Sequence, residues 1–392
     1  MKTGDPNKEA LKRPMKIRCS KAILVNALSA LSRIVPTHAA HPILSGFMIF
    51  TKDNTVVLQA TDLELSLTVT VPAEVESEGC TVVTGRYLTE LIRRLPDGDL
   101  TLQLTEDTQK LEIVYGKASV HISTWAVADF PALPSLPEQN KIIMEGARWK
   151  RIIRKISVAA ASQEVRPNYS GVYIQFQSGQ LKLVATDTYR LAFLSLPYQE
   201  DISDFTLFVP VRPLGEVSRM LDDDQQLEIF WDQATIGFQT KVFTITARLM
   251  DAQFPAYEKV IPKEFQQRIS VNKELFNATL ERAVLFNELP SQQAVVTLKI
   301  EEAVLTISAE AAQVGSIKEE ILLSSSEGEP CEALFTTRYL LDPLKVIDQD
   351  KISLCLNGSR GAAVFLEDGE ESYLHLVLPV RRLTDDTAGA GV

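Results

Sequence analysis

Two similar stretches, VATDTYRLAFLSLP (Val184–Pro197) and QATDLELSLTVTVP (Gln59–Pro72), decide how this chain is organised. Each places Ala-Thr-Asp at the end of an apolar run, continues with alternating apolar residues and stops at a proline. The second stretch lies 125 residues before the first. Self-similarity at a fixed offset is the signature of tandem structural repeats.

A second set of echoes extends the repeat to three copies. Stretches from Val82, Phe208 and Leu334 share a helical pattern followed by a strand pattern, and they start 126 residues apart. ADFPALPSLP from Ala128 is echoed by AQFPAYEKVIP from Ala252. We therefore predict three tandem copies of a unit of about 125 residues. The predicted domains span residues 15–138, 139–263 and 264–382, between a flexible leader (1–14) and a flexible tail (383–392).

Each copy is predicted to fold as an α+β unit. Amphipathic helical patterns open the copies at Ser20–Val35, Ala147–Ser162 and Asn272–Asn287, with Ser20 and Asn272 as N-caps. Alternating strands such as GVYIQFQ and QLKLVAT follow, and then a second helix and more strands. Because each helix has one apolar stripe, we expect antiparallel sheets with the helices on one side. Independent modules on linkers are the alternative, but the joins at 136–140 and 261–265 lack Gly/Ser spacer character.

Composition is typical of a globular protein without a membrane span. Hydrophobic residues make up 45% and charged residues 23% of the 392 residues. The four cysteines are far apart and no signal peptide precedes them, so we expect buried free thiols in a reducing, cytoplasmic compartment. The net charge of −11, taken alone, argues against a nucleic-acid partner.

The charge is unevenly distributed, however. The helical pattern from Ala147 carries five cations and no acid, while Trp149, Ile152, Ile153 and Ile156 recur on the opposite face, which predicts that the cations face away from the core. A solvated surface is the alternative for this helix alone. The other helices of the first two copies also carry a surplus of Lys and Arg, and those of the third copy are nearly balanced. Lys and Arg gathered on the helices of an acidic chain favour phosphate contacts that do not depend on nucleotide sequence.

Three motifs together resemble one family. ATDTYRLA resembles the ATDG-H-R-L-A signature of the bacterial DNA polymerase III beta subunits, the sliding clamps; FPAYEKVIP resembles their F-P-D-Y-x-x-V-x-P stretch, and LVLPVR (376–381) their terminal V-M-P-M-R. The resemblance runs from Met15 to about Arg382. It implies a homodimeric ring of six clamp domains joined head to tail, with helices lining a central hole, strands outside, and duplex DNA passing through. Such a ring holds the replicative polymerase on its template.

The resemblance also implies two sets of site residues. A groove between domains two and three binds linear peptide motifs of the DNA polymerase III alpha subunit, the clamp loader delta subunit and repair proteins. Its apolar walls are expected from Tyr169, Thr186, Tyr189, Leu191, Pro255, Val260, Leu376, Leu378, Pro379 and Val380, with Arg190, Lys259 and Arg381 at the rim. Expected DNA contacts are Arg33, Arg86, Arg93, Arg148, Lys150, Arg151, Arg154, Lys155, Gln163, Arg166 and Arg212. Without the family, most groove residues would be interpreted as strand cores and turns.

The sequence departs from the family at two places. Thr188-Tyr189 stands where the family has Gly-His, so the depth of the groove is expected to differ. His38 lies near a position where the family often has arginine, before His41-Pro42-Ile43-Leu44.

Two other classes of function are less well supported. The sequence has no G-x-x-x-x-G-K loop, no G-x-G-x-x-G and no G-x-S-x-G motif, so we expect neither an enzyme nor a bound cofactor. No metal is expected at His38 and His41, which lie in a proline-rich loop, or at Asp222, Asp223 and Asp224, which read as a solvated turn. A scaffold that binds peptides but not DNA is the other alternative, and the basic helices argue against it.

Overall fold

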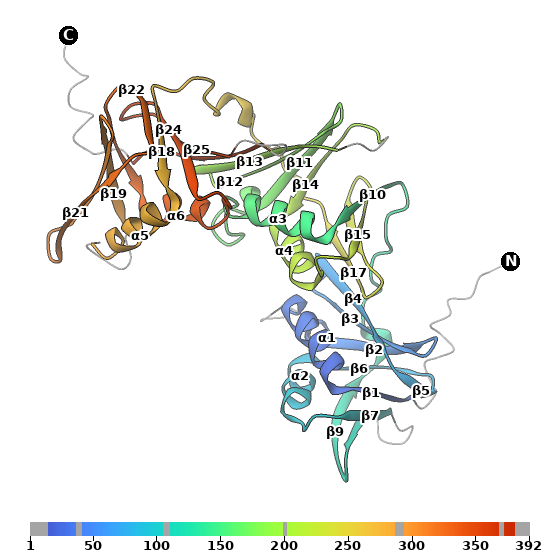
Figure 1. Ribbon diagram of the computed structural model, residues 1–392. Coiled ribbons are helices and arrows are strands. Elements are labelled where there is room, and N and C mark those ends of the chain that lie inside the picture. The colour runs from blue at the N-terminus through green and yellow to red at the C-terminus, as the bar shows by residue number, and fades with distance from the viewer. Residues whose placement is uncertain are drawn as a thin grey trace. The chain divides into compact units, whose positions relative to one another are not determined.

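The computed structural model describes residues 15–36, 41–104, 110–198, 202–286, 294–367 and 372–380 (Figure 1). The chain forms two compact units. The first combines residues up to Trp149 with Arg212–Leu249, and the second combines Lys150–Val211 with the chain from Met250 onward. The predicted leader (1–14), His38, Arg381 and the predicted tail (383–392) lie outside the described residues.

Two helices form in each copy of the repeat, as predicted. They are α1 (Lys21–Ile34), α2 (Gly85–Arg94), α3 (Gly146–Ser157), α4 (Val211–Met220), α5 (Lys273–Ala283) and α6 (Thr337–Leu344). The prediction that the third and fifth helices extend to Ser162 and Asn287 is wrong. After Ser157, the N–H groups of Ala159 and Ala160 bond carbonyls three residues back, which is a turn that ends the helix.

The two predicted N-caps differ in their hydrogen bonding. The Asn272 side chain accepts a hydrogen bond from the Leu275 N–H (3.0 Å), whereas Ser20 occupies the N-cap position of α1 without a side-chain cap bond. Asn272→Ala should therefore lower the free energy of unfolding by about 1 kcal/mol. Ser20→Ala is the matched control and should change it little. Urea unfolding of both variants tests this, and equal losses would contradict the capping assignment.

The first unit contains one antiparallel sheet. Its order is β10-β15-β16-β17-β4-β3-β2-β6-β9-β8-β7-β1-β5. The strands are β1 (Lys16–Ser20), β2 (Gly46–Lys52), β3 (Thr55–Thr61), β4 (Leu65–Pro72), β5 (Glu74–Ser77), β6 (Cys80–Thr84), β7 (Asp99–Leu104), β8 (Lys110–Tyr115), β9 (Ala118–Trp125), β10 (Asn140–Glu145), β15 (Gln226–Trp231), β16 (Thr235–Gln239) and β17 (Phe243–Arg248). Helix α1 packs on α2 and on β1, β3 and β4, burying Leu24, Leu28 and Leu31.

The second unit contains two antiparallel sheets. The nine-stranded sheet has the order β14-β11-β12-β13-β26-β25-β24-β18-β22, and the four-stranded sheet has the order β21-β20-β19-β23. The first comprises β11 (Gly171–Gln177), β12 (Gln180–Thr186), β13 (Arg190–Pro197), β14 (Phe205–Pro210), β18 (Gln267–Asn272), β22 (Ser325–Gly328), β24 (Lys351–Leu356), β25 (Ala363–Glu367) and β26 (Ser372–Val377). The second comprises β19 (Val295–Glu301), β20 (Val304–Ala311), β21 (Gly315–Leu322) and β23 (Cys331–Thr336).

The repeat is visible in three strands of equal length. β4, β13 and β21 each have eight residues and begin at Leu65, Arg190 and Gly315, at intervals of 125 residues. β4 pairs with β17, and β13 pairs with β26. The strand that follows the Ala-Thr-Asp motif thus joins the last strand of the next copy, which explains why the motif occurs twice.

Buried residues agree with the compositional expectations. All four cysteines are free and buried. Burial raises the pKa of the Cys80 thiol, and burial together with the charge of Asp99 raises that of Cys19 to about 12. In the described part of the chain, no helix combines the length and apolar character needed to cross a membrane. No group of three potential metal-ligating side chains occurs among the described residues either.

Candidate functional site

The Ala-Thr-Asp stretch of the second copy forms a tight turn between β12 and β13. The Thr186 hydroxyl donates to the Arg190 carbonyl oxygen (2.6 Å) and accepts from the Thr188 N–H (3.0 Å). The Asp187 carboxylate accepts from the N–H groups of Tyr189 (2.9 Å) and Arg190 (3.0 Å). Asp stabilises such turns because its short side chain reaches the backbone two residues on. The motif therefore fixes the direction in which β13 starts.

The first copy repeats this turn. The Thr61 hydroxyl donates to the Leu65 carbonyl oxygen (3.1 Å), and the Asp62 carboxylate accepts from the N–H of Leu65 (2.8 Å). Leu63 and Thr188 both have positive φ, 79° and 77°. A backbone conformation with positive φ raises the free energy of residues other than glycine, and of the β-branched Thr188 in particular. The hydrogen bonds of the turn hold both residues there.

The aspartates connect neighbouring copies of the repeat. In the first unit, the Asp62 carboxylate pairs with Arg212 of α4, which also donates to the carbonyl oxygen of Ile34 (2.9 Å). In the second unit, Asp187 pairs with Arg190 (3.0 Å), and Arg190 pairs in turn with Asp342 of α6. Each of the first two copies is thus tied through its aspartate to the second helix of the next copy.

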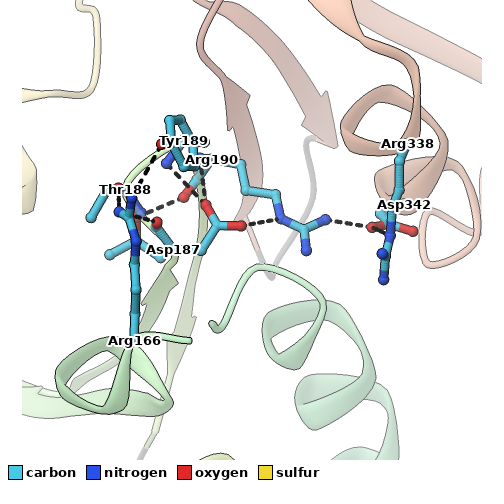
Figure 2. A network of polar contacts seen from close by, with 8 residues as sticks. Arg166, Asp187, Thr188, Tyr189, Arg190, Arg338 and Asp342 are labelled. Carbon is cyan, nitrogen blue, oxygen red and sulfur yellow. Dashed lines mark hydrogen bonds and ion pairs between the residues drawn. The ribbon is translucent and has the colours of Figure 1, made fainter. Parts of the chain in front are cut away.

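The prediction that Arg190 lies at the rim of a groove is wrong. Arg190 is only 7% exposed, because its guanidinium lies between the carboxylates of Asp187 and Asp342 (Figure 2). Burial raises the pKa of Asp342, but hydrogen bonds from Lys345 and Arg190 outweigh it and hold that pKa below its ordinary value. Arg190 therefore joins copies two and three, and it is not available to a ligand.

The other predicted groove residues divide into a buried and an exposed set. Leu191 and Leu376 lie in a buried hydrophobic cluster, the core cluster, which also contains Tyr257. Thr186 is only 7% exposed. The expectation that Leu191, Leu376 and Thr186 form accessible walls of the groove is therefore wrong. We define the junction surface as the exposed residues Tyr189, Pro255, Lys259, Val260 and Leu378 with the partly exposed Tyr169, Pro379 and Val380. Tyr189 and Leu378 of this surface are each two residues along the chain from a member of the core cluster, Leu191 and Leu376 respectively.

One arginine is attached to the turn at the junction surface. Arg166 donates from Nη1 to the Asp187 carbonyl oxygen (3.0 Å) and to the Thr188 hydroxyl, and from Nη2 to the Tyr189 hydroxyl (3.1 Å) (Figure 2). Its guanidinium carbon lies 4.8 Å from the centroid of the Tyr189 ring. Tyr189 in turn stacks on Tyr339 of α6, with centroids 6.3 Å apart. The Thr188-Tyr189 pair thus supplies two of the side-chain groups that Arg166 contacts.

Most predicted DNA-contacting side chains lie at the surface. Arg33, Arg86, Arg93, Arg151, Arg154 and Gln163 are exposed, and Arg148, Lys150, Arg166 and Arg212 are partly exposed. Some of them pair with carboxylates, as Arg33 does with Glu216 (2.6 Å) and Arg154 with Asp348 (2.7 Å). Within their observed bounds, none of α1 to α6 carries a net negative charge.

Lys155, unlike the other predicted DNA-contacting residues, is buried. The prediction that it faces away from the core is wrong, because it is 4% exposed and its Nζ lies 2.5 Å from Oε2 of Glu367 in β25. Its ammonium also lies 5.5 Å from the centroid of the buried Tyr373 ring. A buried, paired lysine is a structural residue and is not placed to contact DNA.

The first copy contains a cavity that no sequence motif predicted. It has a volume of 620 Å³ and is lined by His41, Pro42, Ile43, Leu44, Leu63, Trp125, Ala126, Asp129 and Pro131. Leu63 occupies the same place in its turn as Thr188 does in the second copy. The repeated Ala-Thr-Asp turn, which contains Leu63, was the sequence signal that could have pointed to this part of the first copy.

Comparison with known proteins identifies the family. Models of the DNA polymerase III beta subunit match residues 15–134 (N-terminal domain), 144–256 (central domain) and 258–381 (C-terminal domain). The chain belongs to the DNA polymerase III beta subunit family. Beta sliding clamps of Staphylococcus epidermidis and Staphylococcus aureus are each 25% identical to it over 376 residues, which cover 94% of this chain and 99% of the relative.

Solved structures of beta subunits agree with this family. The sliding clamp from Bacillus subtilis has a TM-score of 0.89 at 26% identity, and the Pseudomonas aeruginosa clamp bound to griselimycin has a TM-score of 0.86 at 26% identity. In both comparisons 94% of this chain and 100% of the other are covered. As a beta subunit with the three-domain clamp fold, the chain is a processivity factor of DNA polymerase III and not an enzyme. DNA and polymerase are therefore among its partners.

Proposed function

We propose that two copies of this chain pair head to tail into a ring of six domains that encircles duplex DNA. The observation that carries the proposal is an open edge in the third copy. β4 and β13 each pair with the last strand of the next copy, whereas β21, at the same place in the repeat, pairs only with β20 within the described residues. An unpaired edge strand is a template for pairing with another chain.

The first copy offers the matching edge. β9 is its last strand, as β17 and β26 are in the other copies. It pairs with β8 over Ala118–Ser123, but with β6 only at Thr124 and Trp125. Pairing β21 of one chain with β9 of its partner repeats the junction already formed twice within each chain. A two-fold dimer uses both edges and closes the ring.

Exposed apolar side chains support this seam. Val314 directly precedes β21 and is 55% exposed, Leu322 is the last residue of β21 and is 81% exposed, and Leu285 after α5 is 71% exposed. Val314 and Leu322 lie at the two ends of the unpaired strand edge, and exposed apolar side chains along such an edge favour pairing with another chain. We propose that these residues of the third copy are covered by the partner chain.

The helices are proposed to provide the DNA-facing surface. Lys and Arg contacts to phosphate are independent of sequence and permit sliding, so ring closure rather than affinity retains the DNA. We assign the DNA contacts to the basic residues predicted for this role, with the exception of the buried Lys155. We place this activity in the cytoplasm, with domain boundaries at residues 138/139 and 263/264.

The junction surface is proposed to bind linear motifs of protein partners. Tyr189, Val260 and Leu378 are 50%, 50% and 37% exposed, which makes them available as apolar contacts for a short peptide. The proposed partners are the DNA polymerase III alpha subunit, the clamp loader delta subunit and other proteins with such motifs.

Encirclement can be tested by retention on DNA of different topology. The purified chain is loaded onto circular duplex DNA with its clamp loader and ATP, and the circle is then cut. We expect retention on the circle and loss after cutting, because a ring slides off free ends. Equal retention on circular and linear DNA would show binding by contact alone, and no loading with a competent loader would favour the peptide-binding scaffold.

A further inference from the structure

The cavity of the first copy is built from three short turns of the first unit. They are the 3₁₀ helix η2 (Pro42–Ser45), the 3₁₀ helix η3 (Val127–Asp129) and the Ala-Thr-Asp turn that carries Leu63. Each turn is closed by hydrogen bonds of its own, such as that from the Leu63 N–H to the Thr61 hydroxyl (3.0 Å). The cavity walls are therefore formed without a ligand, and the volume of 620 Å³ is typical of a ligand site.

Trp125 provides the largest apolar wall of this cavity. A Cβ atom built on Gly46 would lie 2.9 Å from Cζ3 of the Trp125 ring and 2.9 Å from Cγ1 of Val82, so glycine at this position leaves room for the ring. The backbone of Trp125 pairs with Val82 of β6. Leu44, which is 6% exposed, adds a second apolar wall. A large apolar side chain of a ligand can therefore be buried against a surface that is already in place.

Leu63 is the exposed apolar residue of the cavity. Its side chain is 53% exposed, and its φ of 79° is unfavourable for leucine. Strained backbone conformations of this kind cluster at ligand sites, where the surrounding structure holds them. The turn thus keeps a leucine side chain at the cavity that a ligand can cover.

The charge of the cavity is negative. Asp129 supplies the one carboxylate among the described lining residues, and no described residue donates a hydrogen bond to it or forms an ion pair with it. Asp62 of the adjoining turn differs, because Arg212 pairs with it. No lysine or arginine belongs to the described lining, in which His41 is the other titratable residue. The lining is therefore complementary to a ligand with a positive charge.

The repeat shows that this charge is particular to the first copy. In the second copy the 3₁₀ helix η4 (Pro167–Tyr169) follows Arg166, whereas η2 of the first copy follows His41. Gln253 in AQFP stands where the first copy has Asp129 in ADFP. The first copy therefore lacks the cation of the second copy and has a carboxylate in place of an amide, so the two places suit ligands of different charge.

We propose that this cavity binds a segment of a partner protein in which a large apolar side chain lies next to a lysine or arginine. The apolar side chain packs against Trp125, Leu44 and Leu63, and the cation pairs with Asp129. The cavity shares no residue with the junction surface. The inference therefore goes beyond the proposed function and does not depend on peptide binding at that surface.

Two peptides that differ in one charge test the proposal by ligand-observed NMR titration of the full chain. Acetyl-Gly-Ser-Phe-Lys-Ser-Gly-amide carries the cation, and its counterpart has acetyl-lysine in place of lysine. The dissociation constant of the lysine peptide should be about fivefold lower at low ionic strength, and this ratio should shrink as salt is added. In Asp129→Asn the ratio should fall to about one, while binding of the acetyl-lysine peptide changes less than about twofold.

Leu63→Gly locates the apolar contact. Glycine adopts positive φ without strain, so the variant should unfold at a temperature close to that of the unchanged chain. Its affinity for both peptides should fall about fivefold, and the ratio between the two peptides should remain.

Four other outcomes would overturn the proposal. They are a ratio that persists in Asp129→Asn, unchanged affinities in Leu63→Gly, and no binding of either peptide to the unchanged chain up to about 1 mM. The fourth is loss of binding in Leu378→Ala with Val380→Ala, which would place the peptides on the junction surface. Unchanged binding in that double variant supports the cavity as a separate site, whether or not the junction surface binds motifs of its own.

Discussion

Leu322→Asp combined with Val314→Asp should turn the proposed dimer into a monomer. Both side chains are exposed in the single chain, 81% and 55%, so the substitutions should leave its fold intact. In the proposed ring they would be covered, and losing two apolar contacts while burying two carboxylates costs about 3 kcal/mol or more. The dimer dissociation constant should therefore rise at least about 100-fold. Light scattering across a dilution series measures it.

Val165→Asp is the matched control for this variant. Val165 is 75% exposed and lies in the second copy, away from β21 and β9 in the repeat. The Val165→Asp variant should dimerise as the unchanged chain does. Retention on circular DNA should be lost only in the variant that combines Leu322→Asp with Val314→Asp. A double variant with an unchanged dissociation constant would show that β21 is not at the seam.

Arg190→Ala should destabilise the chain more than Asn272→Ala does. It leaves the carboxylates of Asp187 and Asp342 side by side without their shared cation, and the side chains of both are about nine-tenths buried. Removing one partner of a buried ion pair costs about 3–5 kcal/mol. Calorimetry and urea unfolding followed by circular dichroism should show this loss at pH 7.

The loss should depend on pH. The pKa of Asp342 is lowered in the folded chain, so its ionised form adds stability above its ordinary pKa of 3.8, and that stability is lost as the pH falls through the lowered value. The difference between Arg190→Ala and the unchanged chain should therefore narrow below about pH 4. A difference that stays constant down to pH 2 would contradict the role of the ion pairs.

Lys345→Ala provides a comparison within the same network. Lys345 also pairs with Asp342 (2.8 Å), but its side chain is 62% exposed. Solvent screening limits such a pair to about 0–1 kcal/mol. If Lys345→Ala destabilised the chain as much as Arg190→Ala, burial would not explain the effect.

The sequence was most informative where the repeat constrained it. The repeated Ala-Thr-Asp stretches predicted β4 and β13, and the stripe of Trp149 and Ile152 predicted the buried face of α3, because the alternation of apolar residues within each element is a local pattern. The burial of the Lys155 and Arg190 side chains could not be predicted from such local patterns. Their partners Glu367 and Asp342 are 212 and 152 residues away in the chain, so no nearby residue signals that these cations are buried. A helical stripe gives the centre of the buried face but not its width.

The groove residues illustrate the same limit. Motif resemblance selected Leu191 and Leu376 for the groove, but a motif carries no information on depth, and both are core residues. The role of Arg166 in the turn depends on hydrogen bonds to Thr188 and Tyr189, which are the residues where the chain departs from its family. Such contacts follow from the tertiary structure alone.

The Ala-Thr-Asp turn has a consequence for how the ring opens. Asp62 and Asp187 latch the two junctions inside each chain, but the third copy has Ala311 and Ala312 in place of the threonine and aspartate. The proposed seam between chains therefore has strand pairing and apolar contacts but no such latch. In the proposed ring, four joints would be latched and two would not, so we expect the ring to part at the unlatched ones and DNA to enter between subunits while each subunit stays whole.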